Sequence, residues 1–320
     1  MRLLTQMQNP LKNDPWQTQS TEGIPTLTQA REFFIQNARV HGRSRQTLKL
    51  YQWVFDNFSK YVGDPPLDRL NAILLRQYLL SLVDRGFKPT SVGMTYRVLH
   101  AFFVFAVREQ LVAGNPMKDI PTPKVAKLFP FTLDESQVTA LLRACSRQTK
   151  YEVRNYAMLL LFLDCGLRLN ELVTAKLTDV SLVQRSLKVH GKGAKDRIIF
   201  MGAKAAKAVR QWVELRGFRA GYADTLFITR SGEPLKARFV QDIVAKIGKR
   251  SGLKVKLSPH KLRHVSAALA VKNGMDAFTL QRLYGWENVQ TAMRYVNAAA
   301  PQLREAHAKA SPVDRLLEGA

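Results

Sequence analysis

The stretch SLKVHGKGAKDRIIF, residues 186–200, alternates apolar and polar side chains on both sides of a glycine-containing turn. Alternation with a period of two is typical of β-strands, and two such runs joined by a short turn predict a β-hairpin. The sequence before and after this stretch instead repeats its apolar residues at the spacing of a helix. A small hairpin inside a helical region predicts a mainly α domain with a small β-sheet, an α+β fold.

Helical periodicity is found on both sides of the hairpin. Before it, helices are predicted at about 134–146 and 151–166, and Thr132 with Glu135 three residues later predicts a capping box at the first of them. After it, helices are predicted at about 203–216, 237–251, 260–273, 276–284 and 288–296. These segments together predict one domain over residues 131–320.

A separate helical unit is predicted nearer the N-terminus. From Thr26 the apolar residues recur at helical spacing in runs separated by glycine and proline, which predicts a four-helix domain over residues 26–113. Residues 114–130 contain several prolines and lysines without a helical period and predict an interdomain linker. Residues 1–25 are polar, with prolines and no apolar face, and predict a flexible extension.

The charge of the chain indicates a polyanionic partner. The 320 residues contain 49 Lys and Arg against 25 Asp and Glu, a formal net charge of +24. Between residues 181 and 263 there are 20 Lys and Arg and five Asp and Glu, so the excess is concentrated there. No apolar run is long enough to cross a bilayer, which favours nucleic acid over a membrane. A protein lying on a membrane surface is the weakest alternative, because the amphipathic segments are short and separated by turns.

The cysteines and the N-terminus indicate a cytoplasmic protein without a metal site. Cys145 and Cys165 lie in apolar stretches without the spacing of zinc ligands, and we expect them to be buried free thiols. The N-terminal residues lack the apolar segment of an export signal.

Residues 257–264, LSPHKLRH, form the densest candidate for phosphate binding. With Ser258 or Pro259 opening a helix, His260 and Arg263 lie three residues apart on one face, near the positive end of the helix dipole. This arrangement suits a phosphate. A solvated basic helix start is the alternative.

Two further segments carry candidate charges. In residues 164–172, DCGLRLNEL, Gly166 can form a left-handed turn, and Glu171 can hold the guanidinium of Arg168. The alternative is an ordinary surface ion pair. Lys192 lies at the tip of the predicted hairpin, where it can donate a proton to a leaving oxygen, or can be a solvated turn lysine.

Residues 283–296, LYGWENVQTAMRYV, contain two candidate nucleophiles, Tyr284 and Tyr295. A tyrosine suits reversible attack on phosphorus, because its phenoxide is also a stable leaving group. Packing in the core or an interface is the alternative for either residue.

Taken in order, these segments resemble the tyrosine site-specific recombinases of the phage integrase family, most closely its compact Xer-like members. The matching elements are Gly-Leu-Arg168-Leu-Asn-Glu171-Leu, Gly-Lys192-Gly-Ala-Lys-Asp-Arg, Pro-His260-Lys-Leu-Arg263-His264, and Gly-Trp286 followed by Tyr295. The resemblance covers nearly the whole chain from Thr26. It implies an N-terminal SAM-like domain that binds the core DNA site, followed by a mixed α and β catalytic domain.

The resemblance also implies roles for the site residues. The scissile phosphate would be surrounded by Arg168, Lys192, His260, Arg263 and Trp286. Tyr295 would attack it, leaving a 3′-phosphotyrosyl bond and a free 5′-hydroxyl, with His260 assisting removal of the tyrosine proton and Lys192 protonating the 5′ oxygen. Glu171 would orient Arg168, and His264 would be structural or would support the residues that contact the phosphate, so neither would act on phosphorus directly. No metal and no cofactor are implied.

Two residues depart from the pattern of the family. Trp286 stands where most members have histidine, and its indole N–H can still donate to a phosphate oxygen. Tyr284 stands where a leucine is usual, and its position before Gly285 favours packing, which leaves Tyr295 as the expected nucleophile.

The expected partner is double-stranded DNA with paired inverted half-sites. A tetramer, of this chain alone or with a paralogue, would join two such sites and exchange strands through a Holliday junction, in integration, excision or resolution of DNA. Accessory proteins can take part. Residues 301–320 would dock on a neighbouring protomer, and a frayed tail is the alternative. The alternatives are a monomeric type IB topoisomerase and a non-catalytic DNA-binding regulator.

Overall fold

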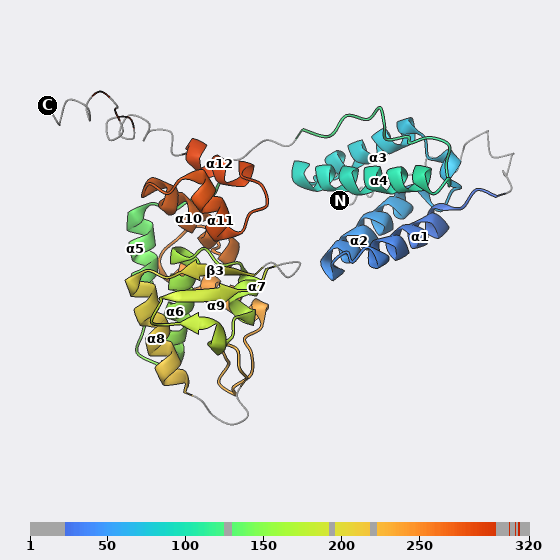
Figure 1. Ribbon diagram of the computed structural model, residues 1–320. Helices are drawn as coiled ribbons and strands as arrows, with labels where there is room; N and C mark the ends of the chain where they lie inside the picture. Colours follow the sequence, from blue (N-terminus) through green and yellow to red (C-terminus); the bar gives the residue numbers. More distant parts are fainter. Residues whose placement is uncertain are drawn as a thin grey trace, which may run out of the picture. The chain divides into compact units, whose positions relative to one another are not determined.

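The structure is a computed structural model that describes residues 23–124, 130–191, 196–217 and 223–298, together with residues 307, 311 and 313. The chain divides into two compact units, Met1–Lys127 and Leu128–Ala320 (Figure 1). Lys192 lies outside the described residues, as do residues 1–22 of the predicted extension and most of the predicted C-terminal tail.

The first unit contains the predicted helical domain. Three of its helices start where short polar side chains cap them: Thr26 forms a capping box with Gln29, and Ser44 and Asn71 accept hydrogen bonds from backbone N–H groups three residues on. The elements are α1 (Leu27–Val40), α2 (Arg45–Val62), the 3₁₀-helix η1 (Leu67–Arg69), α3 (Ala72–Asp84) and α4 (Pro89–Arg108).

Helix α4 is the core helix of the first unit. Contrary to the expectation from the sequence, it is long and apolar enough to cross a membrane, and it is the one such helix among the described residues. Its Leu99, Phe102 and Phe103 are fully buried inside the unit. Phe102 packs edge-to-face against Phe55 of α2, with ring centroids 4.9 Å apart. Packing inside the unit therefore buries 56% of the apolar window of α4.

The second unit is mainly helical with a small sheet, as predicted. Its elements, in chain order, are α5 (Glu135–Ala144), α6 (Lys150–Asp164), α7 (Leu169–Thr174), η2 (Leu177–Asp179), β1 (Val180–Ser181), β2 (Ser186–Val189), β3 (Arg197–Phe200), α8 (Ala203–Arg216), α9 (Ala237–Arg250), α10 (Pro259–Lys272), α11 (Ala277–Tyr284) and α12 (Gln290–Ala298). Helix α6 crosses the core and contacts both α8 and α10.

The predicted hairpin is present as strands β2 and β3. They pair antiparallel, with Leu187 opposite Ile199 and Val189 opposite Arg197, and the short strand β1 adds to the other edge of β2. Leu187, Val189 and Ile199 are buried, so one face of the sheet covers the core. Helices α10, α11 and α12 lie together at one end of this unit, and α11 contacts β3 (Figure 1).

The predicted capping box at Thr132 and Glu135 is wrong. Helix α5 is capped by Asp134, whose carboxylate accepts the N–H of Gln137 at 2.8 Å while the Gln137 side chain accepts the N–H of Asp134 at 3.0 Å. The Thr132 hydroxyl instead donates to the carbonyl of Leu133. An ionised carboxylate is a stronger acceptor than a hydroxyl, so the helix begins two residues later than the motif suggested.

Candidate active site

The Tyr295 side chain lies on α12 and is only 4% exposed. Its hydroxyl is hydrogen-bonded to Nδ1 of His264 on α10. The indole of Trp286 stacks on the phenol ring, with centroids 5.5 Å apart and planes 4° from parallel. Burial raises the pKa of Tyr295 to about 12, although Arg263 and Arg294 oppose the rise. The phenol is therefore protonated near neutral pH.

A second histidine continues this contact toward the surface. His260 lies one turn before His264 on α10, and their Nε2 atoms are 3.0 Å apart. His264 is half-buried and His260 is exposed. Burial, together with the positive charge of Arg263, lowers the pKa of both rings, that of His264 to about 4. Both imidazoles are neutral near pH 7.

Arg263 is buried beside this pair, with 5% of its surface exposed. Its guanidinium donates to the carbonyl of Gly166 and, at 2.5 Å, to the carbonyl of Tyr284. The rings of Tyr284 and Trp286 lie within 4.9 and 5.4 Å of the guanidinium carbon, close enough for cation–π attraction. Burial lowers the pKa of Arg263 to about 10, so it stays charged at neutral pH.

Glu171 binds two arginines at the start of α7. Its carboxylate accepts from Arg168 at 2.9 Å and from Arg197 of β3 at 2.7 and 3.0 Å, and it also accepts the N–H of Arg168 at 2.8 Å. Burial alone would raise the pKa of Glu171, but the hydrogen bonds from Arg197 and Arg168 outweigh it and lower the pKa. The buried carboxylate is therefore ionised, and it anchors one edge of the Arg168 guanidinium as predicted.

Arg168 is positioned to reach a ligand from this anchor. Its other terminal nitrogen donates to the carbonyl of Gly285 at 2.7 Å, and its side chain is 44% exposed. Gly285 ends α11 in the left-handed conformation, with φ +59° and ψ +50°. The turn after α11 thus connects Arg168, Arg263 and the Trp286 ring that covers Tyr295.

Arg197, the last residue of the motif at 191–197, belongs to the site, although its sequence position predicted no role for it. Its Nε donates to the carbonyl of Leu283 at 2.9 Å, and its side chain is only 14% exposed. The alternation along the strand could have predicted that Arg197 faces inward. Arg197 and Ile199 point to the same face of β3, and Ile199 is buried. An arginine on the core face of a strand needs a buried partner, which here is Glu171.

The two candidate tyrosines have different surroundings. The Tyr284 hydroxyl is hydrogen-bonded to Ser266 at 2.5 Å, and its ring is 3% exposed, packed against Gly166. Burial raises the pKa of Tyr284 well above its usual range. Tyr284 is therefore a packing residue, whereas the Tyr295 hydroxyl contacts a histidine.

The structure joins Arg168, Arg263, Trp286 and Tyr295 in one chain of contacts, with His264 and then His260 leading outward. The histidines are arranged differently from the expectation: His264, expected to be structural or to support the residues at the phosphate, contacts the Tyr295 hydroxyl, and His260 reaches it only through His264. The four-residue spacing places His264 one helical turn closer to α12.

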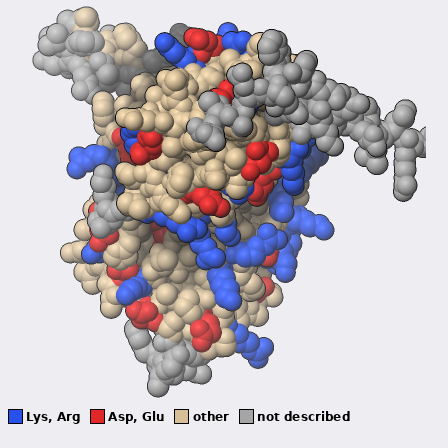
Figure 2. Space-filling view, turned by 90° about the vertical axis from the view of Figure 1, so that its right-hand side faces the viewer, with Lys and Arg blue, Asp and Glu red and all other residues tan. Residues whose placement is uncertain are grey.

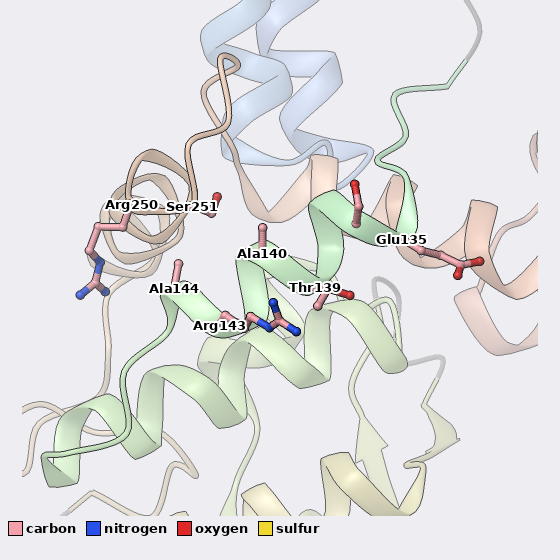
Figure 3. Close-up of a pocket in the computed structure, with 8 residues that line it drawn as sticks. Glu135, Thr139, Ala140, Arg143, Ala144, Arg250 and Ser251 are labelled. Carbon is pink, nitrogen blue, oxygen red and sulfur yellow. The ribbon is translucent and has the colours of Figure 1, made fainter.

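Positive side chains are abundant over the rest of the molecule, because the chain contains 49 Lys and Arg against 25 Asp and Glu. Lys and Arg side chains gather on the face of the molecule shown in Figure 2. Within the described residues, no group of three His, Cys, Asp or Glu side chains could hold a metal ion. A pocket between α5 and α9, lined by Glu135, Thr139, Arg143 and Arg250 among others, shares no residue with the Tyr295 site (Figure 3).

Both units of the chain match known protein families. Residues 132–301 match the model of the phage integrase family, and residues 31–110 match that of the phage integrase N-terminal SAM-like domain. The chain is 31% identical to tyrosine recombinase XerC of Pelobacter propionicus, over 92% of this chain and 98% of that one. It is 34% identical to tyrosine recombinase XerD of Pseudomonas putida, over 86% and 91%.

A solved structure has the same fold. The structure of a lambda integrase tetramer bound to a Holliday junction is 20% identical to this chain and superposes with a TM-score of 0.70, covering 86% of this chain and 78% of that one.

Proposed function

The chain belongs to the phage integrase family of tyrosine recombinases, and on that premise we propose that Tyr295 is the nucleophile of its DNA strand transfer. The protein is a site-specific DNA recombinase that cleaves and rejoins DNA strands. In the proposed reaction the Tyr295 oxygen attacks the scissile phosphate. A 3′-phosphotyrosyl bond forms and the 5′-hydroxyl of the other DNA end is released.

The observation that carries this proposal is the environment of the Tyr295 hydroxyl. It is held by His264, covered by Trp286, and joined through the turn at Gly285 to two arginines. A proton acceptor on the nucleophile and cations for the phosphate are what attack on a phosphodiester requires. Tyr284 has neither a histidine partner nor space for a phosphate, because its ring fills the gap beside Gly166.

The remaining residues divide the work of stabilising the transition state. Arg168 and Arg263 neutralise the non-bridging phosphate oxygens, and Glu171 keeps the Arg168 guanidinium in one orientation. The indole N–H of Trp286 donates to a phosphate oxygen. Lys192, outside the described residues, protonates the 5′ oxygen as it leaves. The covalent link conserves the energy of the phosphodiester, so rejoining uses no nucleotide.

The proposed substrate is double-stranded DNA with paired inverted half-sites, and the proposed working form is a tetramer on two such sites. The net charge of +24 supports binding to the phosphate backbone. The tetramer is supported by the shared fold with the lambda integrase tetramer on a Holliday junction. We place the protein in the cytoplasm with the chromosome, and pairing with a paralogue or with accessory proteins belongs to the same proposal.

Junction formation tests this assignment. A binding site is first selected from randomised duplexes by repeated capture on the protein, and two labelled duplexes carrying it are then incubated with wild-type protein. We expect a branched four-way DNA product, and none from duplexes in which one half-site is scrambled. Relaxation of supercoiled plasmid without any branched product would instead identify a topoisomerase-like monomer.

A further inference from the structure

The structure contains an unbroken line of hydrogen-bonding groups from the Tyr295 hydroxyl to the surface of α10. The hydroxyl contacts Nδ1 of His264, and Nε2 of His264 lies 3.0 Å from Nε2 of His260. Along this line the side chains change from buried at Tyr295 through half-buried at His264 to exposed at His260. The line therefore begins at the nucleophile and ends at an exposed side chain.

The hydrogen positions on this line follow from the groups themselves. A protonated phenol donates, so His264 accepts at Nδ1 and, as a neutral imidazole, carries its proton on Nε2. That Nε2–H donates to Nε2 of His260, which then carries its own proton on Nδ1. One set of tautomers thus satisfies both contacts. In this set the Tyr295 hydroxyl donates to His264, and His264 donates to His260.

Burial and the surrounding positive charges keep both imidazoles neutral, so that each can accept a proton. His264 faces His260 and Arg263 on its own helix, and Arg294 and Tyr295 on α12. Two positive charges and burial disfavour an imidazolium, so the lone pair of Nδ1 is free for the phenol near pH 7. Tyr295 itself stays protonated because it is buried, and it must lose its proton to attack phosphorus.

We propose that His264 is the catalytic base that takes the proton of Tyr295, and that His260 relays this proton to solvent. This inference rests on the proposed role of Tyr295 as the nucleophile. His264 contacts the reacting oxygen directly, and His260 lies on the far side of His264 from Tyr295.

The relay conserves atoms and charge. The Tyr295 O–H bond breaks and its oxygen bonds to phosphorus, while the bond from phosphorus to the 5′ oxygen breaks. The proton joins Nδ1 of His264, the Nε2 proton of His264 moves to His260, and His260 releases its Nδ1 proton to water. The 5′ oxygen takes a proton from Lys192. During rejoining each step runs in reverse, so His264 then returns the proton to the leaving phenoxide.

The test combines His264→Asn with a more acidic phenol. The asparagine amide oxygen can accept the Tyr295 hydroxyl near the position of Nδ1, but an amide cannot pass a proton on. A fluorinated tyrosine, placed at position 295 by an expanded genetic code, loses its proton more readily because fluorine withdraws electrons. The rate of covalent adduct formation on a nicked duplex is measured for each protein, and DNA affinity is measured by fluorescence anisotropy.

We expect His264→Asn to bind DNA normally and to form the adduct about 100-fold more slowly, the usual contribution of a general base. Fluorotyrosine at position 295 should restore at least about tenfold of this loss, because the remaining barrier is removal of the proton. Fluorotyrosine at position 284 is the matched control and should restore none. His260→Asn, which leaves the contact between His264 and Tyr295 in place, should also be slowed and be rescued by fluorination at 295.

Two results would overturn the relay: near-normal adduct formation by His264→Asn, or a slow rate that fluorination of Tyr295 does not improve. The second result would show that the contact only holds the ring in place. No adduct with the wild-type protein would refute the role of Tyr295 itself, and the relay with it.

Discussion

The close packing of Gly166 against Tyr284 predicts a large effect of Gly166→Ala. Gly166 has a φ of +57°, and an added Cβ would lie 2.7 Å from Cζ of Tyr284 and closer still to Cε1. The buried ring is held by its hydrogen bond to Ser266 and cannot turn aside without losing it. Left-handed strain costs about 1–2 kcal/mol and overpacking about 1–3 kcal/mol, so the free energy of unfolding should fall by about 2–5 kcal/mol.

Gly252→Ala is the matched control, because Gly252 also has a positive φ, +78°, and no described atom lies within 4 Å of its added Cβ. It should cost only the strain, about 1–2 kcal/mol. Urea unfolding followed by tryptophan fluorescence measures both, since Trp212 and Trp286 lie in the second unit. In a Tyr284→Leu background the extra cost of Gly166→Ala should disappear. Equal costs for the two glycine variants, or no change in that background, would refute this reasoning.

Three further predictions follow from other parts of the molecule. Glu171→Gln should lower the free energy of unfolding by about 3 kcal/mol at neutral pH, because Arg168 and Arg197 lose a buried partner. The pKa of Glu171 is lower in the folded protein than in the unfolded chain, where it is about 4.3, so its contribution to the free energy of unfolding is complete above that pH. Below that pH the contribution is lost. In denaturant titrations the difference in stability between wild type and Glu171→Gln should therefore shrink as the pH falls. Tyr78→Phe should raise the free energy of unfolding by about 1 kcal/mol, because the buried Tyr78 hydroxyl has no hydrogen-bond partner among the described residues. Tyr96→Phe is the control and should lower the free energy of unfolding by about 1 kcal/mol, because it removes a hydrogen bond to a backbone carbonyl. Adduct formation should proceed at its full rate in EDTA, and a loss restored by Mg²⁺ would contradict the proposed chemistry.

Features that depend on neighbouring residues were predictable from the sequence. The hairpin around residues 186–200 follows from alternation, and α8 has the bounds that its periodicity predicted. Helix α10 begins at Pro259 with Ser258 as its cap, because both residues favour the first turn of a helix. The pairing of Glu171 with Arg168 follows in the same way, because residues three apart share one face of a helix.

Features that depend on tertiary packing were not predictable. Arg197 meets Glu171 from 26 positions away, and Tyr295 meets His264 from 31 positions away. The family resemblance named His260 as the partner of the nucleophile, but the way α12 packs on α10 brings Tyr295 to the histidine one turn further on. Spacing along the chain identified the helix face that carries both histidines, and only the packing of the helices distinguishes between them.

Covalent trapping on DNA tests the central claim, that Tyr295 is the nucleophile, most directly. Each protein is incubated with a nicked suicide duplex carrying the selected site, and adducts that resist denaturant are digested and sequenced by mass spectrometry. The account predicts an adduct with wild type and with Tyr284→Phe, attached to the peptide that contains Tyr295, and none with Tyr295→Phe. An adduct that persists in Tyr295→Phe, or one attached through Tyr284, would contradict it.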